Sequence, residues 1–104
     1  MKIKIGPVIY TIEKANPAQF KRMHNGESDY IGLANHKDSK IFVLEGMAPE
    51  FGDLILTHEI VHAIASVYGL DILQENESGI HTLAVAIVEL MKNNPWWVKR
   101  IMSR

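Results

Sequence analysis

The sequence contains no cysteine, and this absence excludes disulfide bonds, thiolate zinc sites and cysteine-held iron–sulfur clusters. Any metal ion must therefore be held by histidine and carboxylate side chains. An excess of one charge is also missing, because 11 basic and 12 acidic residues leave a formal net charge of -1. This balance argues against nucleic acid and anionic membranes as partners.

Long hydrophobic runs are absent too. No apolar run reaches the roughly 18 residues of a transmembrane helix. Residues 1–7 alternate charged and apolar side chains, whereas a secretory signal needs a continuous apolar segment. We therefore expect a cytoplasmic protein. The 104 residues, 47% hydrophobic and 22% charged, have the composition of one globular domain that spans residues 1–104 and buries a modest core.

The first half of the sequence shows the alternation of polar and apolar residues that is typical of β-strands. We expect strands over residues 2–13, interrupted by a turn or bulge at Gly6-Pro7, and over residues 30–35 and 40–45, joined by a hairpin loop. Between these strands, Pro17 opens a short helical turn, and a loop follows over residues 24–28.

The second half of the sequence is expected to be helical. One helix ends before Gly69, a second covers residues 76–92, and Pro95 opens a short third helix. The first of these begins either with Asp53 as its N-cap or four residues earlier at Pro49. Strands followed by helices predict an α+β domain whose small sheet contains antiparallel strands.

The first expected helix carries an HExxH motif formed by His58, Glu59 and His62. Residues four apart share one face of a helix, so the two imidazoles can bind a single metal ion. Glu59 lies about 100° further round the helix, placed to act on a water molecule at that ion. The rest of this helix is apolar almost all round, which predicts a buried helix whose polar stripe needs a partner. The alternative is a pair of histidines hydrogen-bonded in a solvated groove.

Two histidines leave a catalytic zinc site one protein ligand short. The later part of the sequence offers five candidates: Asp71, Glu75, Glu77, His81 and Glu89. Helical phase favours Glu77 and His81, which lie four residues apart at the margin of the apolar face of the second helix, near its start. Glu89 falls on the opposite, solvated side, and Asp71 and Glu75 are expected in the loop between the helices.

Other histidines and aromatic residues are expected in ordinary roles. His24 and His36 fall in loops, where solvation is the simplest interpretation. Tyr10 and Tyr30 lie near strands, where packing in the core is the stronger expectation.

The sequence resembles small phage and prophage metallopeptidases in four places: residues 53–64, Tyr68-Gly69-Leu70, the Glu77-x-x-Ile80-x-x-Leu83-Ala84 pattern and residues 90–95. These proteins are similar to the ImmA/IrrE group, a minimal gluzincin-like zincin family. In that family the third ligand is a Glu that opens an E-x-x-A-x-x-F/L-A pattern, and it corresponds to Glu77. Ile80 and His81 depart from the family pattern, so His81 stays open as an alternative third ligand or as an outer partner of Glu77.

The resemblance implies a minimal zincin-like domain, in which a small sheet packs on the HExxH helix and the next helix supplies Glu77. It implies one Zn²⁺ per chain, held by His58, His62 and Glu77, with Glu59 as the general base of a peptidase. The implied substrate is a peptide or protein, such as a transcriptional repressor in a phage context, aligned on an edge strand within residues 30–45. Two alternatives are a zinc-stapled adaptor without activity, which binds a repressor or other partner protein, and a metal-free groove binder.

Overall fold

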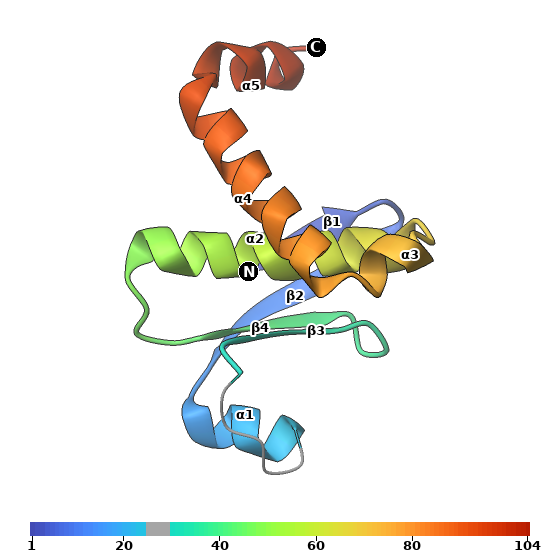
Figure 1. Ribbon diagram of the computed structural model, residues 1–104, viewed down its shortest axis with the longest axis vertical. Helices are drawn as coiled ribbons and strands as arrows, with labels where there is room; N and C mark the ends of the chain where they lie inside the picture. Colours follow the sequence, from blue (N-terminus) through green and yellow to red (C-terminus); the bar gives the residue numbers. More distant parts are fainter. Residues whose placement is uncertain (25–29) are drawn as a thin grey trace.

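The computed structural model describes residues 1–24 and 30–104, so the loop expected over residues 24–28 lies, apart from His24, outside the described residues. The architecture is α+β, as predicted, with a four-stranded mixed sheet, one long helix packed on it, and two further helices beyond that helix (Figure 1). The elements in chain order are β1 (Lys2–Ile5), β2 (Val8–Ala15), α1 (Pro17–Met23), β3 (Gly32–Asn35), β4 (Lys40–Leu44), α2 (Pro49–Val67), α3 (Asp71–Gln74), α4 (Glu77–Asn93) and α5 (Pro95–Met102).

The strands lie in the order β1-β2-β4-β3. The pairs β1–β2 and β3–β4 are antiparallel hairpins, as expected, and Gly6 makes the first turn with a φ of 56°. The central pair, β2 and β4, is parallel, which the sequence did not reveal. Parallel neighbours require a crossover, and α1 and β3 form it here. This order leaves β3 at one edge of the sheet.

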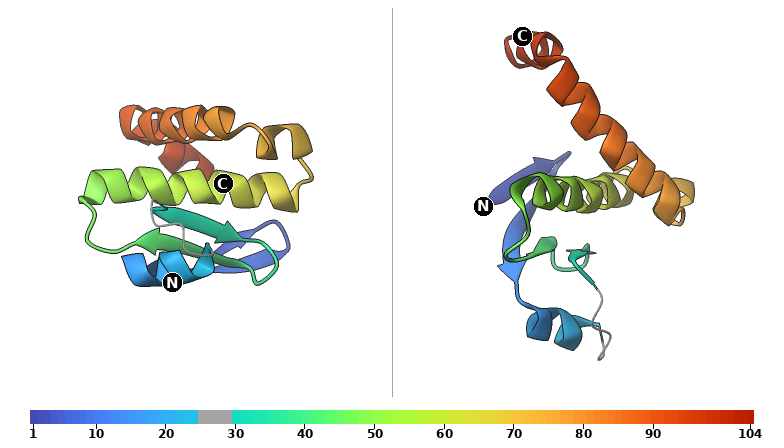
Figure 2. Two further views of the ribbon diagram at one scale, coloured as in Figure 1. Left: turned by 60° about the horizontal axis from the view of Figure 1, so that its bottom comes forward. Right: turned by 60° about the vertical axis from the view of Figure 1, so that its left-hand side comes forward.

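Helix α2 lies between the sheet and α4 (Figure 2). On the sheet side, Ile55 and Ala63 join the main core, whose other buried members are Ile5, Tyr10, Ile41 and Val43. On the other side, Val61 and Ala65 pack against Ile80 and Ala84 of α4. Burial on two sides explains why α2 is apolar almost all round.

The ends of α2 and α4 set the position of the site. Helix α2 begins at Pro49, so Asp53 lies inside the helix and its predicted role as N-cap is wrong. Proline suits the first helical position because its missing N–H would have no partner there. Gly69, with a φ of 69°, lies just beyond the end of α2, as expected. The Asn76 side chain caps α4 by accepting a hydrogen bond from the Gly79 N–H.

The described part of the chain holds no helix with both the length and the hydropathy needed to cross a bilayer.

Candidate metal centre

The two motif histidines lie on a narrow strip of α2 between its two buried faces. With 100° per residue, His58 and His62 fall between the direction of the α4-facing Val61 and Ala65 and that of the sheet-facing Ile55. Their side chains are therefore mostly covered, with exposed fractions of 13% and 14%, yet they open toward the start of α4. The polar side chains of α2 therefore lie between the face of the helix that packs on the sheet and the face that packs on α4.

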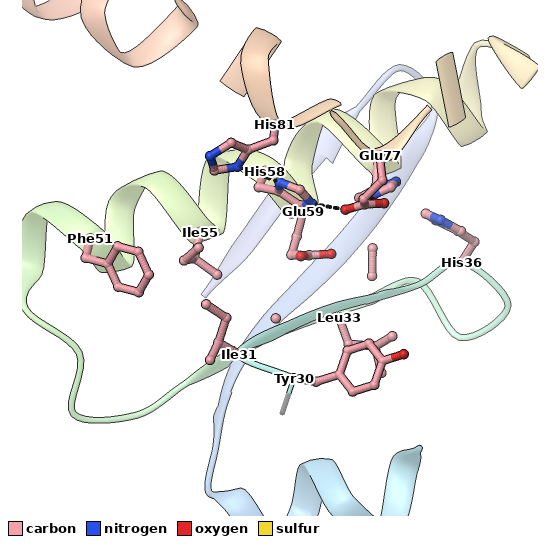
Figure 3. A pocket seen from close by; sticks show the side chains of 13 residues that line it. Tyr30, Ile31, Leu33, His36, Phe51, Ile55, His58, Glu59, Glu77 and His81 are labelled. Carbon is pink, nitrogen blue, oxygen red and sulfur yellow. Dashed lines mark hydrogen bonds and ion pairs between the residues drawn. The ribbon is translucent and has the colours of Figure 1, made fainter. Parts of the chain in front are cut away.

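Glu77, the first residue of α4, faces both imidazoles (Figure 3). The distance from His58 Nε2 to Glu77 Oε1 is 2.5 Å, and that from His62 Nε2 to Glu77 Oε2 is 3.0 Å. The three ligand atoms all lie within 4.8 Å of one another. Two ligands at about 2.1 Å from a tetrahedral zinc ion are themselves about 3.4 Å apart. The His58, His62 and Glu77 group is therefore close enough to hold a metal ion.

The pKa values of His58 and Glu77 depend on burial and on the contacts within this group. Burial lowers the pKa of His58, although its contact with Glu77 acts in the opposite direction. For Glu77, burial alone would raise the pKa, but hydrogen bonds and charge interactions with His62 and His58 outweigh it and lower the pKa. Both shifts favour an ionised Glu77 carboxylate and an unprotonated His58 ring, which are the forms of these two groups that metal binding requires.

The other candidate ligands lie elsewhere. His81 lies on the side of the His58 ring away from Glu77. Its Nδ1 is 3.4 Å from His58 Nδ1, whereas His58 Nε2 faces Glu77. Glu77 therefore completes a donor group with the two histidines, whereas His81 contacts the other side of the His58 ring. Asp71, Glu75 and Glu89 are exposed and outside the group. Asp71 belongs to the short helix α3, where the sequence predicted a loop.

Glu59 points toward the edge strand β3 and is 7% exposed. Burial is the main cause that raises its pKa to about 7; the nearby Glu77 acts in the same direction, while His62 and the Ala34 N–H act against it. A carboxyl group with a pKa near 7 exchanges its proton readily at neutral pH, which suits a general acid or base. Glu59 is thus a buried carboxyl group with a raised pKa close to His62 and Glu77.

The space for the Glu59 carboxylate exists because residue 32 is glycine. A Cβ at Gly32 would lie 2.7 Å from Glu59 Oε2 and 3.0 Å from Cγ2 of Ile55. Carbon and oxygen atoms that are not bonded to each other do not approach this closely, so only glycine lets β3 pass the carboxylate at this distance. Nothing in the sequence singles out Gly32, because a glycine in a short strand gives no sign of what approaches it.

His36 lies in a different environment from the solvated loop tip that the sequence predicted. It is partly buried, its Nδ1 is 3.1 Å from the Tyr10 hydroxyl, and its Nε2 is 2.9 Å from the side-chain nitrogen of Gln74. Burial lowers its pKa, and the nearby His62 adds to this effect. The prediction was wrong because it considered only the hairpin, whereas α3 packs over the hairpin end in the folded chain.

A cavity of about 680 Å³ opens over the site. The His58, His62 and Glu77 group and Glu59 line one side of the cavity, and β3 lines the opposite side. The apolar side chains of Ile31, Phe51 and Ile55 lie at the end away from His36 (Figure 3). The donor group and Glu59 are therefore accessible to a molecule larger than water.

Comparisons with protein-family models, with curated proteins and with solved structures find no match. The resemblance to the ImmA/IrrE group thus stays a prediction, and the functional assignment depends on the geometry of the site.

Proposed function

We propose that this chain is a zinc-dependent peptidase. The observation that supports it best is the convergence, in one cavity, of a His-His-Glu donor group with a buried carboxyl group whose pKa is raised to about 7. Two imidazole nitrogens and one carboxylate oxygen form a donor set typical of catalytic zinc sites, which keep a fourth position for water or substrate. His58, His62 and Glu77 would hold the ion.

Glu59 does not compete with the ligands, because its carboxylate turns toward β3. A bound zinc ion would supply Lewis acidity, which makes water nucleophilic near pH 7 and polarises a peptide carbonyl. Glu59 takes the proton from the attacking water and passes it to the departing amine, so the carboxylate ends the cycle as it began. Glu59 is 7% exposed, so this proton transfer occurs at a carboxyl group that is largely shielded from bulk solvent.

The outer edge of β3, the last strand of the sheet in the described residues, would align an extended peptide. Because the Ile31 carbonyl accepts a hydrogen bond from the Leu44 N–H, alternate residues of this strand pair with β4. The backbone groups of Gly32 and Ala34 therefore face the outer edge, where the Ala34 N–H donates to the Glu59 carboxylate and the Gly32 groups lie beside it. A substrate strand paired there lies next to the general base. A regulatory protein such as a transcriptional repressor, in a phage context, is the substrate that the family resemblance suggests.

A zinc-stapled adaptor is the second candidate, and exposed apolar side chains on the last two helices favour it. Leu90 and Met91 of α4 and Trp96, Ile101 and Met102 of α5 are between 46% and 80% exposed, which is the composition of a protein-binding surface. In this alternative the metal holds α4 against α2, and Glu59 has no catalytic role.

Metal content and hydrolysis of the unaltered chain test the proposal. We expect one zinc ion per chain and cleavage of an internally quenched peptide library, with cleavage lost on chelation and restored by zinc. A chain that binds no divalent ion would refute the metal site. Zinc binding without cleavage of any peptide or protein would favour the adaptor.

Gly32→Ala is expected to slow hydrolysis about 100-fold without loss of zinc, because a displacement of about 1 Å of a catalytic group costs this much. The added methyl group would move the Glu59 carboxylate, and its three nearest atoms belong to Glu59 and Ile55 and to none of the three ligands. Gly52→Ala is the matched control, since a Cβ there meets only Met47 Cβ at 4.0 Å. Zinc content, initial rates and melting temperature of both variants check this prediction. Equal rates for the two variants would show that β3 does not position Glu59.

A further inference from the structure

A chain of hydrogen bonds leads away from His62 into the core. His62 Nδ1 lies 2.7 Å from the Gln74 side-chain oxygen, and the Gln74 side-chain nitrogen lies 2.9 Å from His36 Nε2. His36 Nδ1 in turn lies 3.1 Å from the Tyr10 hydroxyl. The chain thus joins α2, α3, the β3–β4 hairpin and β2, and it ends at a tyrosine that is 2% exposed. His36 is visible at the hairpin end of the cavity (Figure 3).

The direction of these hydrogen bonds decides which nitrogen of His62 is free. The Gln74 oxygen only accepts, so His62 carries its hydrogen on Nδ1, and the neutral ring keeps a lone pair on Nε2. The Gln74 amide donates to His36 Nε2, which leaves the hydrogen of His36 on Nδ1, from where it is donated to the Tyr10 oxygen. Each group thus fixes the hydrogen position of the next.

The reverse direction would oppose metal binding. With the Gln74 amide turned round, His62 Nδ1 would accept a hydrogen bond, and its hydrogen would sit on Nε2, the atom that faces Glu77. Outer partners that hold a ligand histidine in the correct form are a regular part of metal sites. A carboxylate or backbone carbonyl is a usual partner, whereas here the group is a neutral amide that is itself oriented by a second histidine.

We propose that Gln74 and His36 are positioning residues for the metal site, with Tyr10 as their anchor. Gln74 holds the His62 ring with Nε2 toward Glu77, and His36 holds the Gln74 amide in the direction that leaves this Nε2 free. His36 acts through Gln74 and touches neither the metal nor the reacting atoms. The proposal rests on the metal site proposed above, but it does not depend on peptidase activity.

The test measures affinity for Co²⁺ and Zn²⁺ by competition with a chromophoric chelator. Gln74→Leu is expected to lower affinity about 10–100-fold, the usual cost of losing an outer partner. Gln74→Glu keeps an oxygen for His62 and should bind as tightly as the parent or more tightly. Ile72→Ala, a change at an 89% exposed position of the same short helix, is the control and should have no effect. The melting temperature of each metal-free variant shows whether it is folded.

A double-mutant cycle separates positioning from a direct role of His36. His36→Ala alone should lower affinity about tenfold, and it should cost nothing further when Gln74→Leu is already present. Equal losses in both backgrounds would refute action through Gln74, as would parent affinity in Gln74→Leu. A parent chain that binds no metal would instead refute the metal site itself.

A spectroscopic measurement on the unaltered protein gives a test that needs no variant. Two-bond ¹H–¹⁵N correlations of the zinc-loaded chain should show His36 with its hydrogen on Nδ1. A hydrogen on Nε2 of His36 would mean that the chain of hydrogen bonds runs the other way, and the proposal would be wrong.

Discussion

Glu59→Gln is expected to abolish most peptide hydrolysis while one zinc ion per chain remains bound. The amide has the shape of the carboxyl group but cannot accept a proton, and loss of general-base catalysis typically costs about 10²–10⁴ in rate. The fold should not suffer, because a neutral amide is less costly to bury than a carboxylate. Rates on a peptide that the parent cleaves, together with zinc content and melting temperature, check all three parts of this expectation.

Glu50→Gln is the matched control for this variant. It makes the same chemical change on the same helix, at an exposed residue of the first turn, and should leave the rate unchanged. A full rate in Glu59→Gln would contradict the general-base role and leave the metal site untouched. This comparison therefore tests the chemistry separately from the binding of zinc.

Glu77→Gln is expected to lower zinc affinity more than about 100-fold, whereas His81→Ala should lower it only about 10–100-fold, as for an outer partner. The difference follows from the geometry, because Glu77 meets Nε2 of both motif histidines and His81 meets only His58 Nδ1. Chelator competition on both variants gives the ranking. The reverse ranking would make His81 the third ligand.

His58→Ala completes this series. Loss of one of three ligands should also lower affinity more than about 100-fold, with the helical content of the metal-free chain unchanged in circular dichroism. Retention of one zinc ion per chain in His58→Ala would refute the ligand group as a whole.

Local patterns were enough to predict the elements that carry the site. Apolar periodicity and the four-residue spacing of His58 and His62 depend only on helix geometry, so they could be derived before the fold was known. The phase of the second helix also put Glu77 and His81 at its margin, although it did not decide between them. That decision required the position of α4 relative to α2, which depends on packing between residues far apart in the sequence.

Several features had no local signal. The parallel pairing of β2 and β4 depends on the core that their side chains form with α2. Asp53 resembles an N-cap in the sequence but lies inside α2, because residues that suit a cap also occur inside helices. No motif or spacing singles out Gln74, and His36 falls in a hairpin loop where solvation is the simplest interpretation. Their roles come from contacts that span 38 positions between them and 26 positions to Tyr10.

The sequence by itself determined the chemistry available to this protein. Without cysteine, a zinc-type site must use histidines and carboxylates, and a helical spacing of four placed two of those histidines on one face. The sequence also shortlisted Glu77, but only the tertiary structure showed that its carboxylate faces the two histidines, that Gly32 leaves room for Glu59, and that Gln74 contacts His62. The physical reason is that spacing along a helix is set by backbone geometry, whereas distances between elements are set by the packing of the whole core.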